Sequence, residues 1–188
     1  MHLLIAYATT DGQTRKIARF AADRLAGQGH AVELLNVEDA EGLDLSRFDG
    51  AILAGSLHAG GYQKTLARFA RDAAVELALM PTIFLAVSLS AAGNDPGDWA
   101  GLRRCLAEFE ADTGWTPGRV EHVAGAFRFS EYDFFRAWAM RRIADQKGEA
   151  VEPGKDKEYT DWAALILTLD AWVAELTPRV KAGAASAG

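Results

Sequence analysis

The chain has 188 residues, of which 49% are hydrophobic, and a formal net charge of −6 at pH 7. This length and composition are typical of one globular domain with a buried core, and they exclude a disordered chain. The acidic balance argues against a general nucleic-acid binder, because affinity for a phosphate backbone comes from clustered lysine and arginine side chains.

Cys105 is the only cysteine, so it cannot form an internal disulfide. We expect it to be buried in a helix, and a lone thiol does not give the spacing of a zinc site. The first residues lack the pattern of a signal peptide, and no segment approaches the roughly 18 apolar residues of a membrane span. These features favour a cytoplasmic protein that would meet a membrane only from its surface.

Short apolar segments bounded by turn residues alternate with helical patterns along the chain. The predicted strands are residues 3–8, 31–37, 51–55, 82–88 and 118–127. The predicted helices are residues 14–26, 62–79, 98–114 and 159–176. The alternation predicts an α/β fold with a doubly wound, parallel, five-stranded sheet and helices on both faces. We expect one domain over residues 1–177 and a disordered tail over 178–188.

The segment 127–157 interrupts this alternation, since a connection of about 2–6 residues would suffice there. Its first part predicts a basic, aromatic helix, and residues 148–158 are expected to form a mobile loop. Its candidates for substrate or membrane contact are Arg128, Tyr132, Phe135, Arg136, Trp138 and Arg142. The helix could pack on the domain or on a second subunit, lie on a membrane surface, or cover a flat substrate, and the sequence leaves these alternatives open.

Four loops follow the predicted strands at the edge where an open α/β sheet binds its ligand. They are residues 9–14, 56–62, 88–95 and those after Ala126. The first loop offers hydroxyls, a glycine for a tight turn and the N–H groups of a helix start, which are the components of an anion site. A capped helix start without a ligand is the alternative. Neither a Walker motif nor G-x-G-x-x-G is present, so a nucleoside triphosphate or a dinucleotide is not indicated.

The first loop contains a carboxylate, Asp11, and the second contains an imidazole, His58. A carboxylate at Asp11 would cost Coulomb energy if it pointed at a bound phosphate. We therefore expect Asp11 to turn toward exposed backbone or the positive end of the following helix, and to offer an anion only its backbone N–H. His58 is interpreted as a solvated loop imidazole rather than a catalytic group. The neighbouring glycines would let the backbone approach a flat ligand, with Tyr62 nearby.

The loop TTDGQT at residues 9–14 resembles the flavodoxin phosphate loop, whose pattern is [ST]-x-T-G-x-T. Residues 4–18, 51–63, 123–135 and 159–162 together resemble the flavodoxin-like, menaquinone-dependent protoporphyrinogen oxidases of bacterial haem synthesis. The resemblance implies a flavodoxin-like sheet in the order 2-1-3-4-5 and FMN as cofactor. It also implies oxidation of protoporphyrinogen IX with a quinone as electron acceptor. The flavin carries this chemistry, so no dedicated catalytic side chain is implied.

The resemblance also implies which residues hold the flavin. Its phosphate would be held by Thr9, Thr10, Asp11 through its N–H, Gly12, Gln13 and Thr14. Its ring would be bordered by Ser56, Leu57, His58, Ala59 and Gly60 on one side and by Ser88, Leu89 and Ser90 on the other. The segment after Ser56 departs from the family, whose best-known members carry a basic and aromatic pair there. The alternatives are a flavodoxin-type electron carrier, an FMN-dependent quinone reductase, and a flavin-free module that binds a partner protein.

Overall fold

The computed structural model describes residues 1–127 and 157–176. Within these ranges, a parallel five-stranded sheet has the order β2-β1-β3-β4-β5, as predicted. Its strands are β1 (His2–Ala8), β2 (Ala31–Asn36), β3 (Gly50–Ser56), β4 (Thr82–Ser88) and β5 (Arg119–Ala124). β1 and β3 are central neighbours whose last paired residues are Ala8 and Gly55. The loops that follow these two strands therefore begin side by side.

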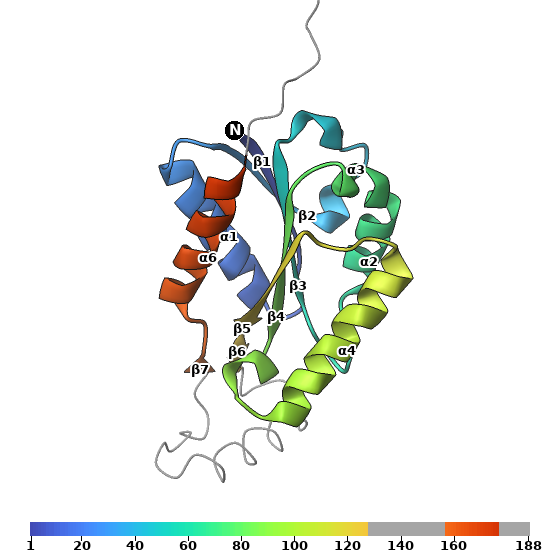
Figure 1. Ribbon diagram of the computed structural model, residues 1–188, viewed down its shortest axis with the longest axis vertical. Coiled ribbons are helices and arrows are strands. Elements are labelled where there is room, and N and C mark those ends of the chain that lie inside the picture. The colour runs from blue at the N-terminus through green and yellow to red at the C-terminus, as the bar shows by residue number, and fades with distance from the viewer. Residues whose placement is uncertain (128–156, 177–188) are drawn as a thin grey trace, which may run out of the picture.

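Helices cover both faces of the sheet (Figure 1). α1 (Gln13–Gly27) and α6 (Trp162–Glu175) lie on one face, whereas α2 (Lys64–Asp72), α3 (Ala74–Ala78) and α4 (Pro96–Thr113) lie on the other. Short 3₁₀ turns are η1 (Val37–Asp39), η2 (Leu45–Arg47) and η3 (Ser90–Ala92). Because successive side chains of a strand point to opposite faces, Ile5 packs with α1 and Leu4 with α2, and both are fully buried.

The helix expected over residues 62–79 is two helices, because the backbone bends at Ala73, where ψ is 7°. The buried positions Leu66, Ala70 and Leu77 keep the spacing of one continuous helix across this bend. The bend does not change the spacing of the apolar residues. The hydrophobic periodicity of the sequence therefore could not reveal it.

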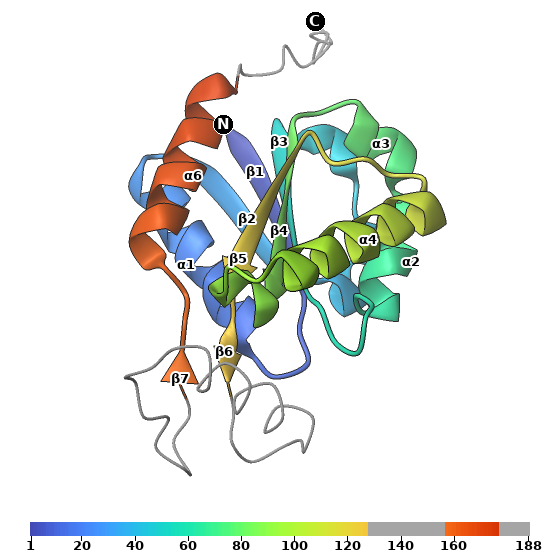
Figure 2. The same ribbon diagram turned by 60° about the horizontal axis from the view of Figure 1, so that its bottom comes forward.

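The end of the fifth strand also differs from the expectation. β5 ends at Ala124, and the N–H of Gly125 makes a last bond to the carbonyl of Ser88, where β4 ends (2.9 Å). The chain then forms β6 (Ala126–Phe127), which pairs antiparallel with β7 (Lys157–Glu158). Lys157 and Glu158 thus lie in a strand and not in the loop expected over 148–158. The β6–β7 ladder lies beyond the carboxyl end of β5 (Figure 2).

Two helices begin where aspartate side chains cap them. Asp161 accepts a hydrogen bond from the N–H of Ala164 (2.9 Å) and so caps α6, which begins at Trp162, three residues after the first residue of the predicted range. Asp95 accepts from the N–H of Asp98 (2.9 Å), so α4 begins at Pro96, two residues earlier than expected. An aspartate followed by proline is a typical helix start, and this signal was available in the sequence.

Several predictions concern residues outside the described ranges. They are the disordered tail over 178–188 and the roles of Arg128, Tyr132, Phe135, Arg136, Trp138 and Arg142. Among the residues that are described, no helix has the length and apolar character needed to cross a bilayer. Cys105 is buried in α4, as expected.

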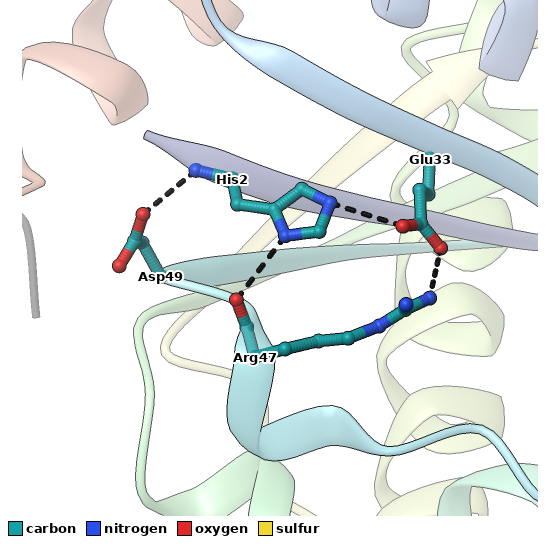
Figure 3. Close-up of polar contacts among 4 residues, drawn as sticks. All are labelled: His2, Glu33, Arg47 and Asp49. Atoms are coloured by element: carbon teal, nitrogen blue, oxygen red, sulfur yellow. Dashed lines mark hydrogen bonds and ion pairs between the residues drawn. The ribbon is translucent and has the colours of Figure 1, made fainter. Parts of the chain in front are cut away.

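A polar network closes the amino-terminal end of the sheet (Figure 3). The backbone N–H of His2 donates to Asp49 (2.7 Å), and its ring nitrogens contact the carbonyl of Arg47 (3.2 Å) and the carboxylate of Glu33 (3.0 Å). The Arg47 guanidinium also pairs with Glu33. These contacts tie β1, β2 and the segment before β3 together at the end of the sheet opposite to the strand-end loops.

Candidate cofactor-binding site

A cavity of about 430 Å³ lies at the carboxyl ends of the central strands. It is lined by the loops after β1, β3 and β4 and by the start of β6. The lining residues are Thr9, Asp11, Gln13, Thr14, Ser56, Leu57, His58, Ala59, Gly60, Val87, Ser88, Leu89, Ser90, Asp98, Gly125 and Ala126. The structure thus brings together all the residues predicted to hold the cofactor except Thr10 and Gly12, which do not line the cavity.

The loop after β1 has the geometry of an anion site. Gly12 has a φ of 84°, a left-handed conformation that favours glycine, and it immediately precedes α1. Its N–H donates to the hydroxyl of Thr9 (3.0 Å). The following N–H groups of the first helical turn have no partner within the helix, and the positive end of the helix dipole lies at the same place.

Thr14 supplies the sharpest test of whether this loop fits a phosphate. Its side chain is 1% exposed, it lines the cavity, and its Oγ1 has no hydrogen-bond partner among the described residues. A buried hydroxyl without a partner costs about 1–3 kcal/mol. A phosphate oxygen in the cavity would accept this hydrogen bond, so the residues present fit an FMN phosphate.

The loop after β3 forms a tight turn at the cavity. His58 and Gly61 exchange both backbone hydrogen bonds (2.9 and 3.0 Å) across Ala59 and Gly60. Both central residues have positive φ, 47° for Ala59 and 86° for Gly60, as a type I′ turn requires. An alanine in this conformation costs roughly 1–2 kcal/mol, so the turn holds backbone strain beside the cavity.

The side chains of Asp11 and His58 meet across the two loops. Asp11 Oδ2 lies 3.2 Å from His58 Nε2, and the two side chains are only 22% and 29% exposed. Each residue stands three positions after the last paired residue of its strand, so the β1–β3 register brings them together. Asp11 therefore contacts His58 and not exposed backbone, while its place two residues before α1 agrees with the other expectation, the positive end of that helix. His58 is half-buried against Asp11, so the expectation of a solvated imidazole is corrected.

The side chain of Gln63 links the loop after β1 to the end of β3 by hydrogen bonds. Its side-chain NH₂ donates to the hydroxyls of Thr10 (3.2 Å) and Ser56, and its carbonyl accepts from the N–H of Ser56 (3.2 Å). The hydroxyl of Thr10 thus accepts a hydrogen bond from Gln63, and Thr10 does not line the cavity. Gln63 was not predicted, since a glutamine at the start of a helix carries no signal of its own.

Gln13 links the phosphate loop to the end of the sheet. Its side-chain NH₂ donates to the Thr160 hydroxyl (2.9 Å), which in turn donates to the carbonyl of Ala124 (2.7 Å). The neighbouring Lys16 pairs with Glu158 in β7 (2.6 Å). The start of α1 is therefore held against the β6–β7 ladder and the start of α6.

Tyr62 does not lie at the cavity, contrary to the sequence-based expectation. Its ring packs against Phe84 and Phe109, with centroid distances of 5.0 and 5.1 Å. Burial raises the pKa of its hydroxyl well above the ordinary range, so the group stays neutral. An aromatic ring gains more free energy from burial against other rings in the core than from a place at an open site, which explains the position of Tyr62.

The remaining cavity wall includes residues that the sequence reasoning missed. Gly125 and Ala126 directly follow β5, and Val87 belongs to β4 itself. The rule that ligands bind beyond the strand ends would have included Gly125 and Ala126 if strand 5 had been ended at Ala124. Asp98 lines the cavity from the first turn of α4. The helix start that Asp95 caps would have indicated its position near the strand ends.

Comparison with known proteins agrees with this architecture. The family model described as a flavodoxin domain matches residues 4–152. Two relatives are named protoporphyrinogen IX dehydrogenase (quinone). The protein from Escherichia coli strain K12 is 29% identical over 163 residues, covering 86% of this chain and 89% of that protein. The protein from Leishmania major is 28% identical over 163 residues, covering 86% of this chain and 70% of that protein.

A solved structure supports the fold independently. The oxidised flavodoxin 1 from Bacillus cereus superposes with a TM-score of 0.52 at 14% identity, covering 94% of this chain and all of that chain. At this identity the likeness concerns the fold alone. The sheet order, the strand-end cavity and a family match over more than half of the sequence lead to one conclusion: the chain belongs to the flavodoxin domain family.

Proposed function

We propose that this protein is an FMN-dependent oxidoreductase that oxidises protoporphyrinogen IX to protoporphyrin IX and passes the electrons to a quinone. The observation that carries the flavin assignment is the strand-end cavity with the buried hydroxyl of Thr14, which has no hydrogen-bond partner in the described parts of the chain. When bound, FMN supplies the redox chemistry, and the protein binds and orients it.

The described residues divide this task between two parts of the cavity. Thr9, Gln13 and Thr14 lie at the start of α1, where N–H groups and the helix dipole favour an anion. The loops 56–60 and 88–90 offer small residues and the apolar side chains of Leu57 and Leu89. A flat isoalloxazine ring between these loops would meet apolar side chains and backbone polar groups, which is the usual lining of a cofactor site.

The choice of substrate rests on similarity. Both relatives described above carry the name protoporphyrinogen IX dehydrogenase (quinone) and align over 86% of this chain. The TDGQT and YTDW segments carry the resemblance to the menaquinone-dependent branch, and from it we further propose menaquinone as the acceptor and haem synthesis as the pathway. Because menaquinone lies in the bilayer, we place the protein in the cytoplasm at the inner face of the cell membrane, in peripheral contact with it.

A spectrum and one anaerobic assay test the proposal. The protein purified with FMN should be yellow, and with protoporphyrinogen IX and a menaquinone analogue it should generate porphyrin fluorescence faster than a protein-free control. A yellow protein without porphyrin formation would leave the electron-carrier alternative. A protein that binds no FMN would contradict the flavin assignment itself.

A further inference from the structure

The charges around the cavity pose a problem for any anionic ligand. Among the described residues that line it, the charged side chains are Asp11 and Asp98, and neither lysine nor arginine is present. His58 is the one described lining residue that can become a cation. A helix dipole contributes only about half a positive charge at the start of α1. Two carboxylates and a phosphate dianion therefore exceed what the helix alone compensates.

We propose that His58 is a positioning residue that, as an imidazolium, neutralises Asp11 and thereby lets this cavity hold the phosphate of FMN. The inference deepens the proposed function, on which it rests for the identity of the anion. It assigns His58 a role in cofactor affinity and not in the redox step.

The geometry of the pair carries this proposal. His58 Nε2 contacts Asp11 Oδ2 at 3.2 Å, whereas Asp11 Oδ1 is buried and receives no hydrogen bond from the described residues. The Asp11 charge therefore depends on His58 for compensation. Asp11 stands two residues before the first residue of α1, and it lines the same cavity as Thr14.

The pair also explains how an acidic residue is accommodated in a phosphate loop. With His58 protonated, the Asp11–His58 pair is neutral as a unit, and the N–H groups of α1 remain available to the anion. Without the cation, the Asp11 carboxylate, which is only 22% exposed, repels the phosphate, because charges held away from water are weakly screened.

Binding of two flavins to a small set of variants tests this role. The variants are His58→Gln, His58→Arg, Asp11→Asn and the double variant Asp11→Asn/His58→Gln, with His30→Gln as the control. His30 precedes β2 at the opposite end of the sheet. FMN and riboflavin differ by the phosphate, so dissociation constants from flavin fluorescence quenching isolate the phosphate contribution.

We expect His58→Gln to weaken FMN binding about tenfold, the effect of one uncompensated charge at this range. Riboflavin affinity should change less than about twofold, because riboflavin carries no phosphate charge. His58→Arg keeps a positive charge and should retain FMN. The double variant should recover most of the FMN affinity, because Asp11→Asn removes the repelling carboxylate.

Three outcomes would overturn the inference while leaving the proposed function standing. They are unchanged FMN affinity in His58→Gln, an equal loss of FMN and riboflavin, and failure of Asp11→Asn to restore FMN binding in the double variant. Thermal melting of each variant identifies loss of folding. A wild-type protein that binds neither flavin would instead overturn the proposed function, and the inference with it.

Discussion

At the scale of single residues, Thr14 separates stability from ligand binding. Its hydroxyl is buried without a partner among the described residues, so the folded protein gains nothing from it. Thr14→Val should leave the free energy of unfolding unchanged or raise it by up to about 1 kcal/mol. The same change should weaken FMN binding roughly tenfold to a hundredfold, the worth of one hydrogen bond to a charged group. Urea unfolding and flavin titration measure the two effects.

Thr113 provides the matched control for this substitution. Its hydroxyl is also buried, but it donates to the carbonyl of Phe109 (2.8 Å) and accepts from the N–H of Trp115 (3.2 Å). Thr113→Val should therefore destabilise the protein by about 1–3 kcal/mol and leave FMN affinity unchanged. If Thr14→Val destabilised the fold as Thr113→Val does, the Thr14 hydroxyl would have a protein partner and not a ligand.

At the scale of elements, the contact between β3 and α2 depends on the absence of a side chain at Gly55. A Cβ there would lie 2.3 Å from Cδ2 of Leu66, which is fully buried. Gly55→Ala should cost about 1–3 kcal/mol, because a packed core cannot accept another methyl group without moving neighbours. Thermal or urea unfolding measures the loss.

Gly101 in α4 is a control for Gly55, because it is a glycine with space for an added methyl group. An added Cβ at Gly101 meets no atom of residues 1–127 or 157–176 within 4 Å, and Gly101 lies inside a helix. Gly101→Ala should stabilise the protein by about 0.5–1 kcal/mol, since alanine loses less backbone entropy on folding. Equal effects of the two substitutions would contradict the packing described between β3 and α2.

At the scale of the whole molecule, the pairing of β6 with β7 means that the segment between these two strands, residues 128–156, can be deleted and replaced by a short turn. Phe127 pairs with Lys157, so an Asn-Gly type I′ turn can replace residues 128–156 without altering the ladder. The excised protein should stay folded and bind FMN. Its protoporphyrinogen turnover should fall by roughly tenfold or more if the insert supplies substrate binding energy. The anaerobic porphyrin assay measures this loss.

Chemical reduction of the flavin and its reoxidation by a quinone serve as the control for the excision. Both should persist, because the described cavity residues remain in place. Full porphyrinogen turnover after excision would contradict a role for the insert in substrate contact. Loss of FMN binding would show instead that the insert supports the cavity.

Much of the architecture was predictable because it depends on local pattern. The apolar segments identified the five strands, and the order of helices and strands predicted a doubly wound sheet. Since parallel strands end at one edge, most residues of the cavity could also be named from the sequence. The bend at Ala73 was missed because it does not change the spacing of the buried positions. The start of β6 was missed because this strand is defined by its pairing with β7, which lies far away in the sequence.

The sequence by itself determined the sheet, its helical layers and the composition of the loops, since apolar periodicity and turn residues act over a few neighbouring positions. Only the tertiary structure decided which side chains meet: Asp11 with His58, Thr10 with Gln63, and Gln13 with Thr160. The physical reason is strand register. These partners are far apart in sequence, and they become neighbours only because specific strands pair and bring specific loops to the same edge.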